Sequence, residues 1–350
     1  MTVRLLSLGT ATPPQTMTQS EALRALGYTS AKAARIFRET GIERRHAWVP
    51  VDQMLKMSWQ EMTVAYRQGA VALSVEAMRD ALDTWPITDI RGLTFCSVSG
   101  YTCPALSYEI AGRLGMREDL IHTNILGAGC QSAIPGLERA VDQVSRHGGK
   151  AAVINAEICS ATYFPASEDD SENLVSNAIF SDAASCAIIG QSDDCRYPEI
   201  VDFESGFRYE YVDLLGYKWQ DGRLKVVLSP EVPRVMPALV AQTVERLLLR
   251  NHVAREQVGA WILHPGGKRV LLGMEEALGL ERHQTEPAWQ VMRDHGNCSS
   301  ATVAMIGKYF GPTKRAPAGG YGVACTMGAG GAVTAALLKW DQRMDDRGSD

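Results

Sequence analysis

Long apolar runs, paired cysteines and an excess of positive charge are all missing from this 350-residue chain. Without an apolar run of roughly 18 residues, no segment is expected to cross a membrane as a helix. The start of the chain, residues 1–7, lacks the apolar core of a signal peptide, and the eight cysteines show no Cys-x-x-Cys spacing. We therefore expect reduced thiols and a cytoplasmic location.

The charge balance argues against large anionic partners. The chain has 35 Lys and Arg against 40 Asp and Glu, a net charge of −5, so neither a nucleic acid nor a membrane surface is an expected partner. A content of 45% hydrophobic and 21% charged residues is that of a globular protein, here long enough for two halves that each bury a core. Small molecules are the expected ligands.

Apolar strand-like runs alternate with amphipathic helical runs along the chain, which predicts an α/β fold. Strands are expected at 3–8, 92–98, 151–155, 182–190, 201–207, 258–263 and 322–327, and again just before Asn297. Helices are expected at 31–38, 60–83, 131–144, 232–250 and from 268 to 276. The polar segment 191–194 suggests a boundary, giving an N-terminal half 1–195, a C-terminal half 196–342 and a charged tail 343–350.

The two halves share one spacing. A strand ends near Val98, and the small-residue turn at Cys130 opens a helix 32 residues later (130 − 98 = 32). A second strand ends at His264, and a similar turn at Cys298 opens a helix 34 residues later (298 − 264 = 34). This match indicates an internal duplication, in which two α/β units face each other and bring equivalent turns together.

Cys130 is the candidate nucleophile. Gly129 before it allows a tight bend, and the following run has helical periodicity, so the thiol is expected near a helix N-terminus, where a thiolate is favoured. The alternative is a buried structural cysteine. His264 and Asn297 would meet Cys130 if the halves are duplicated, although each alone also suits a core histidine or a helix cap. Together they supply a thiol, an ion-pair partner and N–H donors for an oxyanion.

Several motifs resemble the type III polyketide synthases, the chalcone-synthase-like family of the thiolase-fold condensing enzymes. They occur in the family's order over nearly the whole chain and occupy residues 9–14, 41–45, 129–130, 177–183, 264–267 and 296–301. His-Pro-Gly-Gly at 264–267 and Gly-Asn-Cys-Ser-Ser-Ala at 296–301 resemble that branch more than the ketoacyl synthase III enzymes. The resemblance implies a thiolase-like fold of two pseudo-symmetric halves in αβαβα layers.

By this resemblance, Cys130 carries the acyl chain from an acyl-CoA starter, while His264 and Asn297 stabilise the enolate formed when malonyl-CoA loses CO₂. The enolate then attacks the thioester in a Claisen condensation, and cyclisation gives a pyrone or resorcinol of secondary metabolism. Coenzyme A thioesters are substrates, and no metal or organic cofactor is implied. The alternatives are a ketoacyl synthase III-like single-condensation or acyl-transfer enzyme, which can use an acyl carrier protein, a thiol hydrolase and a degenerate acyl-binding protein.

The resemblance also assigns further positions, with departures. Phe180 aligns with an aromatic gate, but Val226 stands where the second gate aromatic is usual. The remaining matches are cavity-lining Cys159, Thr162 and Ser299, Cys103 at a homodimer interface, and Lys32 and Arg35 for coenzyme A phosphates. Glu39 replaces a third basic residue, and Ala329 replaces a usual proline in a glycine loop.

Overall fold

The computed structural model describes residues 2–82, 85–164, 167–311, 317 and 319–341. Its centre is a nine-stranded sheet with the order β11-β12-β13-β8-β1-β7-β6-β4-β5. A single registered pair, Arg4 with Glu199, joins β1 to β8, so the sheet is divided into two parts there. The nine strands are β1 Thr2–Ala11, β4 Ile90–Ser97, β5 Ile121–Leu126, β6 Lys150–Glu157, β7 Ala183–Ser192, β8 Glu199–Phe207, β11 Val258–Leu263, β12 Tyr321–Gly328 and β13 Ala332–Lys339.

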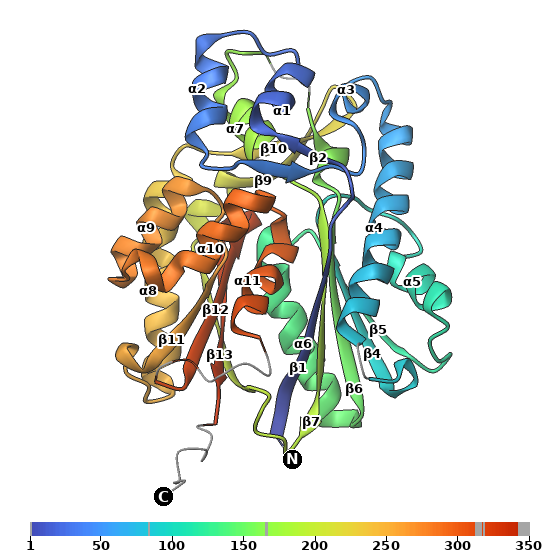
Figure 1. The fold of residues 1–350 in the computed structure, drawn as a ribbon, viewed down its shortest axis with the longest axis vertical. Coiled ribbons are helices and arrows are strands. Elements are labelled where there is room, and N and C mark those ends of the chain that lie inside the picture. Colours follow the sequence, from blue (N-terminus) through green and yellow to red (C-terminus); the bar gives the residue numbers. More distant parts are fainter. Residues whose placement is uncertain (1, 83–84, 165–166, 312–316, 318, 342–350) are drawn as a thin grey trace, which may run out of the picture.

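Helices cover both parts of this sheet and fill the space between them (Figure 1). α4 and α5 pack on the outer face of one part, and α8 with α9 on that of the other, while α6 and α11 lie in the middle and α10 lies beside β11 and α11. This is the five-layer αβαβα arrangement expected from the sequence. These helices are α4 Trp59–Leu82, α5 Leu106–Leu114, α6 Ala133–His147, α8 Val232–Arg250, α9 Lys268–Leu278, α10 Arg282–His295 and α11 Thr302–Phe310.

A smaller layer lies over one end of the sheets, at the top of Figure 1. It contains two two-stranded antiparallel sheets and four helices, and it covers the ends from which the site residues emerge. Its elements are β2 Thr16–Thr18, β3 Arg44–His46, β9 Leu215–Gln220, β10 Arg223–Leu228, α1 Gln19–Ala25, α2 Ala31–Glu39, α3 Val51–Met54 and α7 Ser171–Ile179.

The strand order confirms the pseudo-symmetry expected from spacing. Read outward from the junction, one part runs β1-β7-β6-β4 and the other β8-β13-β12-β11, so β4 and β11 take equivalent places. The helices that follow Cys130 and Asn297, α6 and α11, are the two central helices. The boundary at 195 and 196 stays a prediction, and the tail 343–350 lies outside the described residues.

One local expectation needs correction, and two features were not predicted. The strand expected before Asn297 is wrong, because α10 occupies that segment and begins with a capping box between Glu281 and Gln284. The polar segment at Asp221 and Gly222 is the turn of the β9–β10 hairpin, where both residues have positive φ, 49° and 71°. β5 was not predicted, because this edge strand is only half-buried and lacks a long apolar run. In the described part, no helix is long and apolar enough to cross a membrane.

Candidate active site

Cys130 lies in a short 3-10 turn, Gly129–Ser132, that connects β5 to the first turn of α6. Gly129 has φ 66°, and a Cβ at this position would lie 2.8 Å from the backbone nitrogen of Ala329. The glycine therefore allows the nucleophile turn to pack directly against the loop at Ala329. Ala329 itself opens another 3-10 turn, in which Gly330 takes the left-handed conformation with φ 74°.

His264 is held beside this turn by the pairing of β11 with β12. Its backbone N–H donates to the carbonyl of Cys325 over 2.9 Å, and the neighbouring Thr326 hydroxyl donates to the carbonyl of Gln131 over 3.1 Å. The segments that carry His264 and Cys130 are thus hydrogen-bonded to adjacent residues of β12, Cys325 and Thr326. The His264 side chain is 1% exposed, and its Nδ1 has no hydrogen-bond partner.

Asn297 precedes α11 and lies beside the loop that follows His264. Its Nδ2 donates to the Gly266 carbonyl over 2.7 Å, and its Oδ1 accepts from the Ser299 backbone N–H over 2.8 Å. A side-chain amide has two N–H donors, so one remains for a ligand. The Ser299 hydroxyl lies 3.3 Å from Cys130 Sγ. These links place Asn297 and Ser299 beside Cys130 and connect Asn297 to the loop that follows His264.

Burial sets the protonation states of the unliganded site. Desolvation raises the pKa of the Cys130 thiol to about 12, and the nearby Glu157 adds to this shift, while a hydrogen bond from Ser299 opposes it. Desolvation also lowers the pKa of His264 to about 4. Burial therefore disfavours the charged form of each group in the site without substrate. The helix N-terminus expected to favour a thiolate is thus opposed by the cost of burying its charge, and the thiolate stays a prediction.

Glu157 is a site residue that sequence reasoning missed. It is fully buried at the end of β6, and its Oε1 accepts from the hydroxyls of Ser300 and Ser299 over 2.6 and 3.3 Å. Its Oε2 accepts the backbone N–H groups of Val98 and Ser99, each over 3.1 Å. A charged residue at the end of an apolar strand, as Glu157 is at the end of β6, was the feature of the sequence that could have indicated a site residue.

Phe180 lies next to Asn297, with which it forms an isolated parallel bridge. It is half-buried, and its carbonyl accepts from Arg45 Nη1 over 3.0 Å and from the Tyr163 hydroxyl over 2.8 Å. Phe180 is thus fixed through its backbone, while its ring keeps some exposure. This position is compatible with a gate.

Val226 is buried in β10 and pairs across the hairpin with Tyr217 in β9. Directly opposed residues in an antiparallel pair point to the same face. The hydroxyl of Tyr217 is hydrogen-bonded with Thr162, and burial raises its pKa, with contributions from Cys159 and Cys130. Position 226 carries no aromatic ring, but Tyr217 on the neighbouring strand supplies one on the same face.

Cys159 and Thr162 lie close to this group of residues. Both are buried in a 3-10 turn after β6, and the Thr162 hydroxyl donates to the Cys159 carbonyl over 2.9 Å. The pKa of Cys159 is raised mainly by burial, with contributions from Glu157 and Cys130 among others, which places the three groups near one another. Ser299, Thr162 and Cys159 thus surround Cys130, together with Tyr217, which was not predicted.

The other predicted residues lie away from this cluster. Cys103 is exposed in the segment between β4 and α5. Lys32 and Arg35 lie on α2, where Lys32 Nζ donates to the Asp169 carbonyl over 3.1 Å and Arg35 is exposed. Glu39 ends the same helix and is also exposed.

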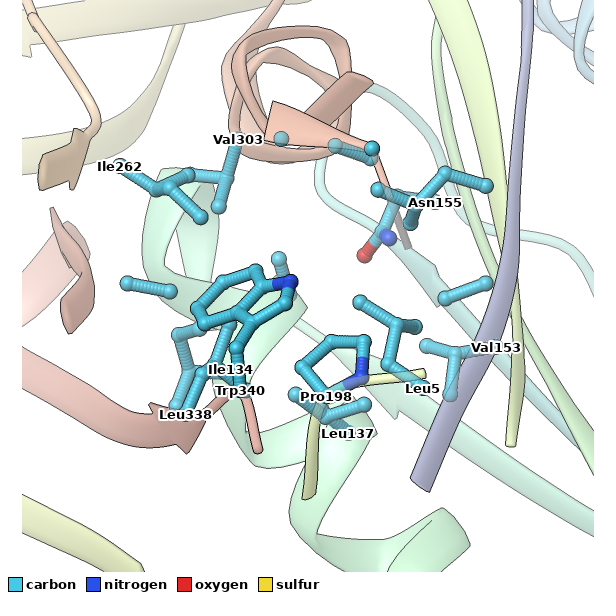
Figure 2. Close-up of a pocket in the computed structure, with 17 residues that line it drawn as sticks. Leu5, Ile134, Leu137, Val153, Asn155, Pro198, Ile262, Val303, Leu338 and Trp340 are labelled. Atoms are coloured by element: carbon cyan, nitrogen blue, oxygen red, sulfur yellow. The ribbon is translucent and has the colours of Figure 1, made fainter. Parts of the chain in front are cut away.

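A separate apolar cavity lies in the middle layer, between the first turns of α6 and α11 (Figure 2). Leu5, Ile134 and Val303 are among its lining residues, and Asn155 is the main polar contributor. It contains no nucleophile, so the chemistry is not located there. Within the described residues, no group of three or more His, Cys, Asp and Glu side chains is placed to hold a metal ion.

Comparison with known proteins matches both parts of the chain to one family. Residues 2–193 match the N-terminal domain of the chalcone and stilbene synthases, and residues 214–339 match their C-terminal domain. The chain is 30% identical to a 3,5-dihydroxyphenylacetyl-CoA synthase from Streptomyces toyocaensis, over 96% of this chain and 90% of that protein. It is 28% identical to a 1,3,6,8-tetrahydroxynaphthalene synthase from Streptomyces peucetius subsp. caesius, over 95% and 91% of the two chains.

A solved structure shows the same fold. The chain superposes on PKS-I from the brown alga Ectocarpus siliculosus with a TM-score of 0.88 and 22% identity, covering 97% of this chain and 98% of that one. This agreement supports the αβαβα architecture over the full length. Together with the two domain matches, it places the chain in the chalcone and stilbene synthase family, as a type III polyketide synthase and hence an acyltransferase.

Proposed function

We propose that Cys130 is the nucleophile of this synthase and that His264 and Asn297 act on malonyl-CoA. Cys130 takes the starter acyl group from coenzyme A as a thioester. The imidazole N–H of neutral His264 and the free amide N–H of Asn297 then donate to the malonyl thioester carbonyl. When CO₂ leaves, negative charge moves to that oxygen, and fixed donors in a buried site stabilise it more than they stabilise the substrate.

The observation that carries this proposal is the chain of contacts linking the three residues. Ser299 touches Cys130 and donates its backbone N–H to Asn297, whose amide is bonded to the loop after His264. The enolate formed beside this pair would lie within reach of the Cys130 thioester, which it attacks to extend the chain. The test is incubation of the protein with radiolabelled malonyl-CoA and a panel of acyl-CoA starters. Labelled cyclic products support the proposal, and free acid released without malonyl-CoA would instead indicate a hydrolase.

A polyhydroxylated aromatic ring built from malonyl units is the product class we propose. The two Streptomyces relatives are named for 3,5-dihydroxyphenylacetyl-CoA and 1,3,6,8-tetrahydroxynaphthalene, both of which carry hydroxyls at alternating ring carbons. Tyr217 supports small starters, because its ring occupies space beside Cys159 and Thr162. Mass spectrometry of the products distinguishes several extensions with ring closure from the single extension of a ketoacyl synthase III-like enzyme.

Replacing Tyr217 by alanine is expected to enlarge the cavity and shift products toward larger starters or roughly one further extension, because a ring beside the growing chain is removed. Product masses measure the shift. Tyr217→Phe keeps the ring and is expected to keep the product length. Lys218→Ala, at the exposed neighbouring position, is the matched control. An unchanged product spectrum in Tyr217→Ala would place Tyr217 outside the extension space.

Cys130 is expected to react with iodoacetamide faster than Cys96, Cys186 and Cys325. The other three are fully buried, whereas Cys130 is partly exposed and receives a hydrogen bond from Ser299. Peptide mass spectrometry after short exposures gives the order. Equal labelling of all four would contradict a reactive site at Cys130.

A homodimer is proposed from the surface near Cys103. Tyr101 and Tyr108 are 69% and 54% exposed beside it, and β5 is the edge strand of the sheet on this side. Large exposed aromatics next to an open strand edge are typical of an interface.

We also propose that Lys32 and Arg35 bind coenzyme A phosphates, with an acyl carrier protein as the alternative acyl donor. The protein is further proposed to work in the cytoplasm. The free thiols of all eight cysteines support a reducing compartment.

A further inference from the structure

The two faces of the β9–β10 hairpin have different partners. On one face, Tyr217 pairs with Val226 and is hydrogen-bonded with Thr162. Because side chains alternate along a strand, Lys225 lies on the other face. Its Nζ donates to Asp170 Oδ2 over 2.6 Å, and Asp170 is the residue directly before α7. One face of the hairpin therefore contacts the candidate site, and the other is tied to α7.

The ion pair between Lys225 and Asp170 is largely buried. The side chain of Lys225 is 10% exposed and that of Asp170 is 29% exposed, and Lys225 Nζ lies 5.5 Å from the centre of the Phe164 ring. Burial opposes the ionisation of Asp170, but hydrogen bonds from Lys225 and the Asn173 backbone N–H outweigh it and lower the pKa of this carboxyl. Removing one partner would leave the other charge poorly solvated and unpaired, so the pair is costly to break.

Asp170 also determines where α7 begins. It is the N-cap residue of this helix, and its Oδ1 accepts the Asn173 backbone N–H over 3.1 Å. The helix ends at Phe180, the gate candidate. Leu228, the last residue of β10, packs against the same apolar cluster as Phe180. β10 thus approaches α7 at both ends of the helix, through an ion pair at its start and apolar contacts at its end.

The segment before Asp170 is itself anchored to another helix. The carboxylate of Glu168 accepts the backbone N–H groups of Thr29 and Ser30 over 2.8 and 2.7 Å. Ser30 is the N-cap residue of α2, so Glu168 is bound to the start of that helix. Asp170 is therefore held in place from both sides, by the contact of Glu168 with α2 and by its own contact with α7. The hairpin is the element that the ion pair restrains.

We propose that the Lys225–Asp170 ion pair is a clasp that sets the spacing between Phe180 and the hairpin and thereby selects the starters that reach Cys130. The inference rests on the proposed roles of Phe180 as a gate and Cys130 as the nucleophile. With the clasp closed, the hairpin lies against α7 and the space beside Phe180 stays narrow. Without it, the hairpin moves more freely and larger acyl groups pass. Lys225 and Asp170 are positioning residues, which act through the hairpin and the helix.

The chain offers variants that remove the clasp with little other change. Asp170→Asn loses the charge but keeps a helix cap, because asparagine and aspartate are about equally good N-cap residues. Lys225→Met removes the opposite charge and keeps an unbranched apolar side chain. Asp80→Asn is the matched control, because Asp80 also accepts a backbone N–H, from Thr10 over 2.8 Å, and a lysine Nζ, from Lys308 over 2.6 Å.

Hydrogen exchange measured by mass spectrometry tests whether the clasp restrains the hairpin. Backbone amides of residues 215–228 are expected to exchange about tenfold faster in Asp170→Asn and Lys225→Met, and at the wild-type rate in Asp80→Asn. This measurement needs no substrate, so it is independent of the proposed function. Circular dichroism establishes that each variant is folded, and Lys225→Met carries the test if Asp170→Asn does not fold. Unchanged exchange in the folded clasp variants would overturn the clasp.

Starter selection is tested by single-turnover loading of Cys130 from acetyl-CoA and octanoyl-CoA, with the adducts measured by mass spectrometry. The ratio of octanoyl to acetyl loading is expected to rise about tenfold in Asp170→Asn and to stay unchanged in Asp80→Asn. A wild-type ratio in Asp170→Asn, despite faster exchange of the hairpin, would overturn the role in selection. If the wild type loads neither starter, the proposed function fails, while hydrogen exchange still decides whether the clasp forms.

Discussion

Cys130→Ala is expected to form no detectable polyketide while still releasing CO₂ from malonyl-CoA. The proposed mechanism places the growing chain on this thiol, so its removal leaves nothing for the enolate to attack. His264 and Asn297 remain in place, because the links from Asn297 to Gly266 and Ser299 do not pass through the sulfur. Product chromatography and a radiometric CO₂ assay, run on the same sample, measure the two activities separately.

The control for this experiment is Cys159→Ala, which removes another thiol from the same cavity wall. It is expected to keep chain extension, with any change confined to product distribution. Full extension by Cys130→Ala would contradict the assignment of the nucleophile. Loss of both extension and CO₂ release in a folded Cys130→Ala would show that the two activities are not separable as proposed.

Asn297→Ala is expected to reduce malonyl-CoA decarboxylation by ~10²- to 10³-fold, the usual effect of removing one donor from an oxyanion site. The free amide N–H of Asn297 is lost, together with its contact to the Gly266 carbonyl. Transfer of a starter acyl group to Cys130 does not use the malonyl oxyanion, so loading is expected to be affected much less. Single-turnover loading and steady-state CO₂ release give the comparison.

His264→Gln and His264→Ala make a graded pair for the second donor. Glutamine keeps a side-chain N–H, so His264→Gln is expected to retain more decarboxylation than His264→Ala. Equal activity of the two, both close to wild type, would remove His264 from the decarboxylation step. Equal loss of loading and decarboxylation in Asn297→Ala would indicate a disturbed loop instead of a missing donor.

The fold could be anticipated because it depends on local patterns. Apolar strands ending at Val98 and His264 occupy equivalent places in the sheet, and the turns at Cys130 and Asn297 open the two central helices. The spacing therefore reflected a real duplication. The family motifs at the same positions then specified the chemistry.

What the sequence did not reveal depends on register and burial. Tyr217 reaches Thr162 because it pairs with Val226 across a hairpin, and that register was not apparent from the polar turn at Asp221. Glu157 belongs to the site because its donors come from two other parts of the chain. A helix N-terminus beside Cys130 is visible in the sequence, whereas the desolvation that opposes its ionisation depends on burial and is not.

Mass spectrometry of the Cys130 peptide, trapped during turnover with an acyl-CoA starter and malonyl-CoA, tests the central claim most directly. The account predicts a thioester on Cys130 whose mass rises in steps of one ketide unit, and no such series on Cys159 or Cys298. In Asn297→Ala, the starter adduct should accumulate without the series. An unmodified Cys130 during active product formation would contradict the claim.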